Sequence, residues 1–313
     1  MYHIIVNPAS RSGKGARLWE RVEAELNKRK VAHEVYFSKR AGFVSEHVRE
    51  VTEAWNAGNN AEPLKIIVLG GDGTVNEMIQ GIADFSRVEL GYIPSGSSND
   101  LARDLQLPKD QLEILDIILA GETRRTMDIG EVSLSGGEKN RLFAVSSGLG
   151  FDAAVCAEVL TTPLKETFNK VGLGKLIYLA IALKQLVTAK NVAANLYLDD
   201  SEEAIHIKKF IFAAAMVHRF EGGGFKFCPQ ADYTDGLLDI CAVGNIAKGT
   251  MLMALPFAFS GKHYIFRGIE HYRAKTLRLE VSEPLWVHTD GEVEEPAKAV
   301  TMTCQAGKLT LLC

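Results

Sequence analysis

The chain has 313 residues, of which 47% are hydrophobic and 24% are charged. This composition is typical of a folded globular protein and argues against disorder, and the length is sufficient for two domains because single cores stop growing near about 250–300 residues. The 35 Lys and Arg against 39 Asp and Glu give a net charge of −4, which argues against nucleic acid as a partner because nucleic-acid-binding proteins usually carry a basic excess.

The cysteine pattern indicates a reducing compartment. The five cysteines are scattered and include no CxxC pair, which argues against a zinc site or a disulfide framework. The chain opens without the basic and apolar regions of a signal peptide. Its longest apolar stretches are shorter than the roughly 18–20 residues of a membrane-spanning helix. We therefore expect a cytoplasmic protein that contacts membranes transiently, from their surface.

The first 128 residues alternate between strand and helix patterns. Apolar and β-branched runs predict strands at residues 2–6, 33–38, 66–69, 90–93 and 126–129. Apolar residues at helical spacing predict helices between them. This alternation predicts a doubly wound parallel sheet, and we assign residues 1–128 to an α/β nucleotide-binding domain. In such sheets ligands bind beyond the carboxyl ends of the strands, so the loops at those ends are the candidate site.

The loop after the first strand reads NPASRSGKG over residues 7–15. Apolar residues recur at helical spacing from Leu18 onward, so residues 12–15 are expected at a helix N-terminus, where N–H groups attract phosphate. The loop is not a Walker A motif, because Lys14 is followed by Gly15 and not by Ser or Thr. A glycine-rich connection with a solvated lysine and no ligand remains an alternative.

The loop after the third strand contains an acid among glycines. The apolar run 66–69 continues directly into Gly-Gly-Asp-Gly-Thr at residues 70–74, and a helix pattern follows. Glycines let a ligand approach the backbone closely, and Thr74 is expected to cap the helix. A tight turn without a ligand would share these features. Because the carboxylate of Asp72 would repel a bare phosphate, the loop indicates a nucleotide that carries Mg²⁺.

A third polar loop follows the fourth strand. Residues 94–102 read PSGSSNDLA and continue into a helix pattern. The loops after strands one, three and four therefore all lie at carboxyl ends of one predicted sheet. This convergence predicts a nucleotide site more strongly than any single motif.

Strand patterns dominate the second half of the chain. They fall at residues 131–134, 141–146, 192–198, 205–217, 237–243, 272–281, 285–289, 300–304 and 308–312. The first two form a predicted hairpin across residues 135–140, and a helical insert at 171–188 interrupts the series. The pattern predicts an antiparallel β-sandwich domain over residues 129–313, whose C-terminal segment can return to the first domain.

Three features of this second half carry possible chemistry. Residues 221–225, EGGGF, are too rich in glycine for a strand interior and predict a bulge or a close ligand approach. Residues 232–239 gather side-chain oxygens that suit Mg²⁺ or Ca²⁺, although a capped β-turn explains them equally well. Residues 288–292, HTDGE, place two carboxylates beside a glycine, which an ordinary Asp-Gly hairpin turn explains almost as well.

Five motifs together resemble one family. They are VNPASRSGKG at 6–15, GGDGTVNE at 70–77, PSGSSNDLAR at 94–103, GGGF at 222–225 and DGLLD at 235–239. In combination they resemble the diacylglycerol kinase catalytic family, specifically its soluble bacterial lipid kinases, with sphingosine and ceramide kinases as relatives. The GGDGT motif alone is shared with NAD kinases, whereas the SGSSND and DGLLD segments favour the lipid branch. The resemblance covers nearly the whole chain.

The resemblance implies ATP-dependent phosphorylation of a lipid hydroxyl, such as that of diacylglycerol, with ATP bound between the two domains. The positions that match nucleotide contacts are Asn7, Ser12, Gly13, Lys14, Ser38, Gly70, Gly71, Asp72, Gly73, Thr74, Val75, Asn76 and Ser97.

The resemblance also assigns acids to catalysis and to metal binding. Asp72 and Asp100 match acids that organise the catalytic Mg²⁺, and Glu292 matches the proposed general base. Asp235, with the backbone carbonyls of Asp232 and Leu237, matches a structural Mg²⁺ site.

The chain departs from the family pattern at two positions. Ser97 stands where Thr is common, which keeps the hydroxyl and loses a methyl group. His218 precedes the glycine loop where many relatives have Asn, so the contacts of that loop differ. We expect His218 to have a structural role, as isolated histidines usually do.

Two other functions share part of this pattern. A kinase of a soluble acceptor such as NAD would use the same glycine loop and Asp72. A non-catalytic regulator that binds nucleotide or lipid would keep the fold. The presence of Asp72, Asp100 and Glu292 together argues against the regulator, because binding alone needs no general base.

A lipid kinase takes its substrate from a membrane surface, so we expect peripheral membrane contact. One candidate is the basic segment 11–40, whose nine Lys and Arg and four Glu give a net charge of +5. Others are the apolar helices predicted at 176–186 and 251–259, although their apolar faces favour packing in the core. An exposed edge of the sandwich could pair two chains into a homodimer.

Overall fold

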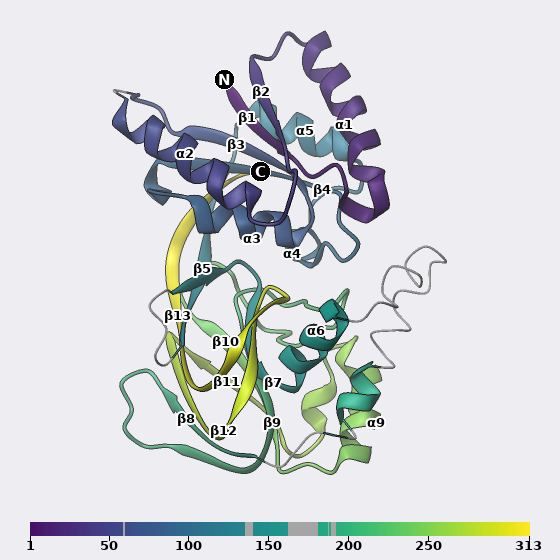
Figure 1. Ribbon diagram of the computed structural model, residues 1–313, viewed down its shortest axis with the longest axis vertical. Helices are drawn as coiled ribbons and strands as arrows, with labels where there is room; N and C mark the ends of the chain where they lie inside the picture. Colours follow the sequence, from purple (N-terminus) through teal and green to yellow (C-terminus); the bar gives the residue numbers. More distant parts are fainter. Residues whose placement is uncertain (59, 135–139, 162–180, 187, 189–191) are drawn as a thin grey trace. The chain divides into compact units, whose positions relative to one another are not determined.

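The computed structural model describes residues 1–313 except residues 59, 135–139, 162–180, 187 and 189–191 (Figure 1). The chain forms two compact units: unit 1 contains residues 1–129 and 305–313, and unit 2 contains residues 130–304. The chain crosses from one unit to the other within two strands, β5 (Arg124–Leu134) and β13 (Glu292–Leu312).

Unit 1 contains a parallel sheet with helices between its strands. The other elements are β1 (Tyr2–Val6), α1 (Ser10–Lys28), β2 (His33–Phe37), α2 (Phe43–Ala57), β3 (Leu64–Gly70), α3 (Asp72–Gly81), η1 (Phe85–Arg87), β4 (Val88–Pro94), α4 (Asp100–Asp104) and α5 (Gln111–Ala120). The sheet order is β13-β4-β3-β1-β2, and every neighbouring pair in it is parallel. The predicted α/β class and the predicted alternation of strands and helices are confirmed.

The strand order fixes where a ligand can bind. The chain moves outward from β1 to β2 and then returns past β1 to β3. Because such crossovers are right-handed, this reversal places α1 and α2 on opposite faces of the sheet. Ligands bind at the carboxyl ends of the strands where the order reverses. In this unit that point lies between β1 and β3.

Apolar side chains hold the helices on the sheet. Trp19, Val22 and Leu26 of α1 are buried with residues of α5 in one core over β1 and β3. On α2, Val44 and Val48 are buried as the helical spacing predicts. Helix α2 packs closely on α3, because a Cβ at Gly81 would lie 2.4 Å from the Ser45 carbonyl oxygen. The polar loops at the strand ends are therefore supported by closely packed helices and strands.

Unit 2 is built mainly from antiparallel strands. Its elements are β6 (Arg141–Phe143), β7 (Ser146–Gly150), α6 (Phe151–Thr161), β8 (Val192–Leu198), β9 (Ile205–Met216), β10 (Leu238–Gly244), α9 (Lys248–Ala258), η2 (His263–Ile265), β11 (Ile269–Ala274) and β12 (Thr276–Thr289), with most of β13. Neighbours follow the order β11-β10-β9-β7-β12-β13, and β8 also pairs with β9 and β12. The predicted β-rich second half is confirmed, and so is the antiparallel pairing of β5 with β6.

The structure corrects several predicted strands. The predicted strands 126–129 and 131–134 are one strand, β5, the predicted strand 285–289 belongs to β12, and the predicted strand 141–146 is divided between β6 and β7. The predicted strand 272–281 is two strands, because the chain breaks at Lys275, whose N–H donates to Asp199 Oδ1 at 2.7 Å. The predicted strands 300–304 and 308–312 are one continuous strand, β13, whose end pairs in parallel with β4. Of the predicted helical insert at 171–188, residues 171–180 and 187 lie outside the described residues, whereas 181–186 are helical. Residues 135–139 of the predicted hairpin turn also lie outside the described part.

Unit 2 buries its own apolar core. Residues such as Phe143, Phe210, Leu279 and Met302 are at most 1% exposed and belong to one cluster drawn from β6, β9, β12 and β13. A second cluster lies under α9. Among the residues that the structure describes, no helix is long and apolar enough to cross a membrane.

Candidate active site

The loops after β1 and β3 are joined where the strand order reverses. The backbone N–H of Asn7 donates to the Leu69 carbonyl oxygen at 2.9 Å. The side-chain Nδ2 of Asn7 donates to Thr74 Oγ1 at 3.2 Å. Thr74 is 6% exposed and is the third residue of α3, so the prediction that it caps this helix is wrong. Helix α3 instead begins after Gly71, and Thr74 uses its hydroxyl to hold the neighbouring loop.

Glycines let the loops after β3 and β4 pack backbone against backbone. A Cβ at Gly96 would lie 2.7 Å from the Gly71 Cα, and one at Gly70 would lie 2.5 Å from the Thr74 side chain. The Ser95 N–H donates to the Gly70 carbonyl oxygen at 2.7 Å. A larger residue would collide with the backbone of Gly71 at position 96 and with the Thr74 side chain at position 70. The glycines therefore determine how closely the acids that follow them can approach.

Asp72 and Asp100 come together through this packing. Asp72 Oδ2 accepts the backbone N–H of Asp100 at 2.9 Å, and its Oδ1 accepts the Tyr92 hydroxyl at 3.1 Å. Asp100 is 4% exposed and forms an ion pair with Arg103. Burial and the Asp72 carboxylate raise the pKa of Tyr92 well above its usual value, so this hydroxyl stays a donor. Carboxylates at adjacent strand ends supply oxygen ligands of the kind that Mg²⁺ prefers, although Arg103 already supplies positive charge to Asp100, as Arg273 does to Asp235 below.

The loop after β1 has an unusual backbone. Arg11, Ser12 and Gly13 have φ values of 47°, 57° and 89°, so the regular part of α1 begins only after Gly13. Two of these are non-glycine residues in the left-handed region, a strained arrangement that often marks functional loops. A Cβ at Gly15 would lie 2.3 Å from the Asn7 carbonyl oxygen, so this position needs glycine. The Ser10 hydroxyl lies 2.7 Å from that of Ser95 and links this loop to the loop after β4.

The positions predicted to contact the nucleotide differ in how exposed their side chains are. The three predicted loops are in contact, as the strand pattern indicates, and Ser38 lies beside the end of β1 because its N–H donates to the Val6 carbonyl oxygen at 2.8 Å. Lys14 and Ser97 are exposed, whereas Val75 and Asn76 are buried within α3. Their roles stay predictions.

Glu292 lies in unit 2, directly after a tight turn. Thr289 pairs with Glu292 across the β12–β13 hairpin, and the turn residues Asp290 and Gly291 have φ values of 51° and 84°. Positive φ at both turn residues is the arrangement that an Asp-Gly hairpin favours. The Glu292 side chain is exposed. The simpler structural interpretation of this motif is therefore correct, and it leaves Glu292 available for chemistry.

Asp290 anchors this turn. Its carboxylate accepts the backbone N–H groups of Ala144, Val145 and Ser146 at 2.7–2.9 Å. The sequence suggested only a turn residue here, because the three donors are more than 140 residues away. The hairpin that carries Glu292 is thus fixed to the start of β7.

A buried charge cluster lies behind the same hairpin. His288 is fully buried, and its Nε2 lies 3.0 Å from Asp152 Oδ2 and 3.4 Å from Glu221 Oε1. Burial alone would lower the pKa of His288, but Glu221 and Asp152 outweigh burial and raise it to about 9. The Gly291 N–H points at His288 Nδ1 over 3.4 Å, a contact that a protonated Nδ1 gives up. The protonation state of His288 therefore bears on the turn before Glu292.

Glu221 begins the predicted glycine loop. Glu221 and Phe225 exchange two backbone hydrogen bonds of 2.9 and 3.0 Å, which close the loop. Gly222, Gly223 and Gly224 all have positive φ, with values of 65°, 84° and 119°. The predicted irregular backbone is confirmed, and its first residue faces His288.

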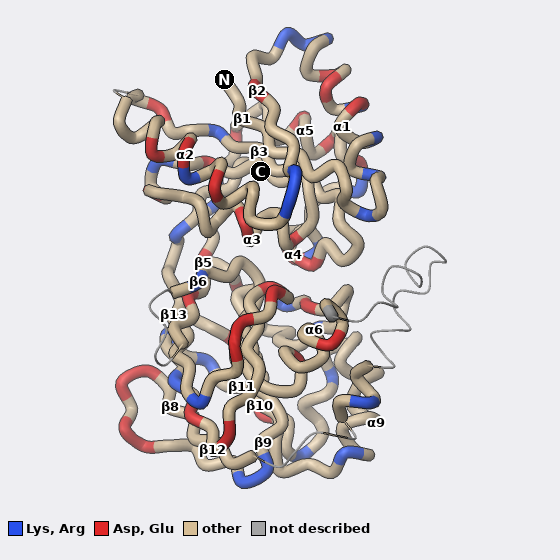
Figure 2. The backbone as a smooth tube through the Cα atoms, in the orientation of Figure 1, with Lys and Arg blue, Asp and Glu red and all other residues tan. Residues whose placement is uncertain are grey.

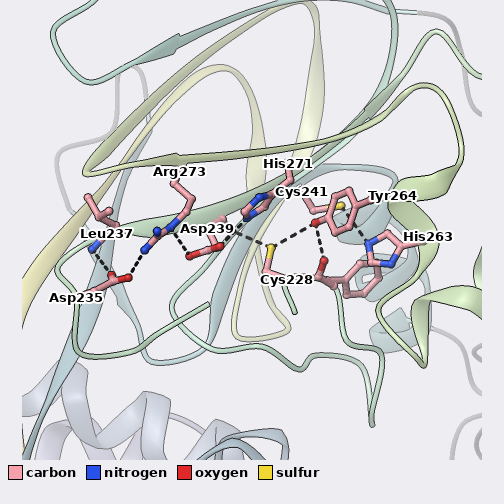
Figure 3. Close-up of polar contacts among 10 residues, drawn as sticks. Cys228, Asp235, Leu237, Asp239, Cys241, His263, Tyr264, His271 and Arg273 are labelled. Atoms are coloured by element: carbon pink, nitrogen blue, oxygen red, sulfur yellow. Dashed lines mark hydrogen bonds and ion pairs between the residues drawn. The ribbon is translucent and has the colours of Figure 1, made fainter. Parts of the chain in front are cut away.

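The predicted structural Mg²⁺ site contains an arginine (Figure 3). Asp235 Oδ1 accepts the Leu237 N–H at 3.0 Å, and its Oδ2 binds the guanidinium of Arg273. Asp232 Oδ1 accepts the N–H and hydroxyl of Thr234 at 3.0 and 2.7 Å, as in the capped turn that was the alternative. Arg273 thus already supplies positive charge to Asp235.

The donor set at this position fits a divalent cation poorly. Both oxygens of Asp235 have donors, and burial raises the pKa of Asp235. Arg273 also lies 3.4 Å from Asp239 Oδ2, while His271 lies 2.6 Å from Asp239 Oδ1 (Figure 3). Among the described residues, no group of three or more His, Cys, Asp or Glu side chains is arranged to hold a metal. The metal site at Asp232, Asp235 and Leu237 stays a prediction, and a cation there would have to compete with Arg273 for Asp235.

Cysteine and histidine side chains lie beside this network. Cys241 lies 3.9 Å from His263, and burial raises the pKa of Cys241 to about 12 and lowers that of His263 to about 4. The Tyr264 hydroxyl donates to the Phe227 carbonyl oxygen at 2.6 Å. His218 is buried and stacks on Tyr233 with ring centroids 5.0 Å apart, in agreement with the structural role expected for it.

Comparisons with known proteins give two family matches. Residues 1–132 match the diacylglycerol kinase catalytic domain, and residues 144–313 match the YegS C-terminal NAD kinase beta sandwich-like domain. A diacylglycerol kinase of Mycobacterium tuberculosis is 31% identical over 237 residues, which cover 75% of this chain and 72% of that protein. A diacylglycerol kinase of Staphylococcus epidermidis is 28% identical over 294 residues, which cover 92% of this chain and 84% of that protein.

A solved structure has the same fold. The crystal structure of a diacylglycerol kinase from Bacillus anthracis aligns with a TM-score of 0.74 at 22% identity, covering 99% of this chain and 96% of that one. At this level of identity the match supports the fold, and the sequence matches support the family.

The His288 cluster predicts a dependence of stability on pH. Because the folded-state pKa of about 9 exceeds the ordinary value of 6.5, its stabilisation is complete below pH 6.5 and is lost as pH rises through 9. Urea denaturation of the wild type at pH 6, 7.5 and 9 should show this loss, on the order of 3 kcal/mol. His288→Asn should flatten the profile, whereas the exposed His206→Asn should not. Parallel profiles for wild type and His288→Asn would contradict the assignment.

Arg273 gives a second prediction. If its guanidinium supplies the charge at Asp235, EDTA should leave the unfolding temperature unchanged, and Arg273→Gln should lower it by several degrees, because the nearly buried Asp239 loses a partner. Asp72→Asn, which lacks the other predicted metal ligand, serves as the control in the same thermal scans. A drop with EDTA in both wild type and Asp72→Asn, reversed by Mg²⁺, would instead establish the predicted metal site.

Proposed function

The chain belongs to the diacylglycerol kinase family, and we propose that it is an ATP-dependent lipid kinase whose acceptor is the hydroxyl of a diacylglycerol. The observation that carries the proposal is the contact of Asp72 with Asp100 at the ends of β3 and β4, beside the point where the strand order reverses. This is where a parallel sheet binds nucleotides. A pair of acids there makes sense chiefly with a metal-bound phosphate.

Unit 1 supplies the nucleotide half of the reaction. Asp72 and Asp100 would hold Mg²⁺, which when bound neutralises charge on the phosphate oxygens. The glycine loop at 70–74 presents backbone N–H groups at the start of α3, where the helix dipole favours an anion. The bond from Asn7 to Thr74 keeps the two phosphate loops in register. Because phosphoryl transfer depends mainly on positioning and charge neutralisation, rigid loops serve catalysis directly.

Unit 2 supplies the proposed base. Glu292 would accept the proton of the acceptor hydroxyl as the oxygen attacks the γ-phosphate. Its support is the exposed carboxylate at a turn that Asp290 fixes with three backbone hydrogen bonds. A base held by such a turn loses little freedom in reaching its reactive geometry.

Labelled ATP and Mg²⁺ with a panel of acceptors test the proposal. The panel contains diacylglycerol, a polyprenol, a sphingoid base and a glycolipid in mixed micelles, and NAD without detergent. Labelled diacylglycerol as the main product would support the proposal. Transfer to NAD alone would assign the chain to kinases of soluble acceptors, and ATP binding without transfer would favour a regulator.

Asp72→Asn should abolish most of the turnover. The amide cannot provide the negative charge that a metal needs, and we expect kcat to fall by about 10²–10³-fold. The folded state should persist, because an amide oxygen can still accept the Asp100 N–H. The matched control is Asp84→Asn, which changes an acid that caps η1. Turnover within a factor of two of wild type, in a variant with an unchanged unfolding temperature, would remove Asp72 from the site.

Glu292→Gln should separate binding from chemistry. The amide keeps the shape of the side chain but cannot accept the proton, so ATP affinity should stay constant while kcat falls by at least about 10²-fold. Glu295→Gln is the control, because it neutralises another exposed acid of the same hairpin. Isothermal titration with ATP and steady-state kinetics measure the two quantities. Equal losses in both variants would point to hairpin charge and not to a specific base.

A further inference from the structure

Helix α9 and the segment after it expose apolar side chains. Of the ten large apolar side chains that are exposed among the described residues, five lie between residues 252 and 265. They are Leu252 at 43%, Met253 at 60%, Phe257 at 40%, Phe259 at 55% and Ile265 at 70% exposed. Single exposed apolar residues are ordinary, but a cluster of them marks an interaction site. These five residues are called the α9 surface below.

Helix α9 is apolar on both of its faces. Met251, Ala254 and Ala258 are buried against the core of unit 2. Helical spacing places Leu252, Met253 and Phe257 on the opposite side. The expectation that core packing accounts for this helix is thus right for one face only. A helix that is apolar all round needs a second apolar partner.

The charged residues within the stretch that carries this surface are basic. Residues 244–269 contain Lys248, Lys262 and Arg267 and no Asp or Glu, in a chain whose net charge is −4. All three basic side chains are exposed, and Figure 2 shows blue segments at α9. Exposed apolar residues surrounded by basic residues are typical of surfaces that bind anionic bilayers, where the apolar groups enter the interface and the cations meet the headgroups.

A second copy of the chain fits this surface less well. A two-fold interface brings the same patch of both copies together, so Lys248, Lys262 and Arg267 of one copy would share the interface with the same three basic residues of the other. Like charges across an interface cost binding energy. An anionic bilayer has the complementary charge.

The other predicted lipid-contacting segments have weaker support. In the basic segment 11–40, Arg29 pairs with Glu25 at 2.7 Å and with Asp116 at 2.6 Å, and Arg40 pairs with Glu46. These pairs neutralise part of its charge locally. Of the predicted helix 176–186, residues 176–180 lie outside the described residues.

The α9 surface continues into the glycine loop of unit 2. The ring of Phe259 stacks on that of Phe225, with centroids 4.1 Å apart. The Lys226 N–H donates to the Ala258 carbonyl oxygen at 2.8 Å. The same loop begins at Glu221, which lies 3.4 Å from His288 in the hairpin of Glu292. One loop therefore contacts both the exposed apolar surface and the hairpin that carries the proposed base.

We propose that the α9 surface is the membrane-docking site of this protein. Leu252, Met253, Phe257, Phe259 and Ile265 enter the interface of an anionic bilayer, and Lys248, Lys262 and Arg267 contact its headgroups. The choice of a bilayer as partner rests on the proposed function as a lipid kinase. Docking at this surface places lipid beside the loop that leads to Glu292.

Vesicle co-sedimentation of the full chain tests this proposal. The vesicles contain phosphatidylcholine with about 30% phosphatidylglycerol, at low and high salt. Met253→Ser combined with Ile265→Ser changes the two most exposed side chains of the surface, at 60% and 70%, and should not disturb the core. We expect the partition coefficient to fall by about tenfold or more. Trp286→Ser is the matched control, because Trp286 is 41% exposed and lies outside the surface, on β12; it should bind as wild type does.

A second variant tests the charges. Lys248→Gln combined with Lys262→Gln should weaken binding at low salt and have little effect at high salt, since the electrostatic contribution is already screened there. Vesicle binding that is unchanged in the Met253→Ser/Ile265→Ser variant would overturn the proposal. So would a wild-type dimer that this variant converts to a monomer in analytical ultracentrifugation while vesicle binding persists, because the surface would then join two chains.

The test separates this proposal from the proposed function. Vesicle binding does not depend on catalysis, so loss of binding in the variant supports the docking surface even if no lipid in the panel is phosphorylated. If diacylglycerol is the acceptor, the variant should lose activity on vesicles and keep it in mixed micelles, where docking is no longer limiting. Equal activity of the variant and wild type on vesicles would count against the docking surface.

Discussion

The candidate site depends on one close approach, that of Gly71 to Gly96. Any side chain at Gly96 would place its Cβ 2.7 Å from the Gly71 Cα. With both side chains absent, Asp72 reaches the backbone N–H of Asp100 at 2.9 Å. Tyr92 donates to the Asp72 carboxylate, and Arg103 forms an ion pair with Asp100. In the proposed function both acids would hold the cation, so the close approach of the glycines determines where that proposed metal site lies.

The second unit positions its acid in a different way. The hairpin of Glu292 is fixed by polar bonds to distant parts of the chain, through Asp290 to residues 144–146 and through His288 to Asp152 and Glu221. Polar networks of this kind define one geometry only when every member is satisfied. Their strength therefore depends on the protonation of His288, whose pKa of about 9 keeps it charged near neutral pH. Unit 1 relies on close backbone packing, and unit 2 relies on buried charge.

Sequence patterns predicted the parts of the fold that local periodicity determines. The strands β1 and β8 have the predicted bounds, and the three polar loops meet because parallel strands end at a common edge. Partners chosen by tertiary contact were missed. Thr74 has the chemistry of a cap but bonds to Asn7, and Arg273 reaches Asp235 from 38 residues away. No local pattern links His288 to Asp152 or Glu221. The amino-acid sequence also does not indicate which face of α9 stays exposed.

The two units divide the chemistry of the proposed reaction between them. The residues proposed to bind phosphate and metal lie in the loops of unit 1, whereas the proposed base, the glycine loop and the α9 surface all lie in unit 2. Within unit 2 these features are contiguous, because Phe259 contacts Phe225 and the loop that Phe225 closes begins at Glu221, beside His288. An acceptor that stays in a bilayer must meet its base near the surface that contacts the bilayer. The proposed docking surface and the proposed base both lie on unit 2 and are linked through the glycine loop, so a single unit carries both of the features that this requirement concerns.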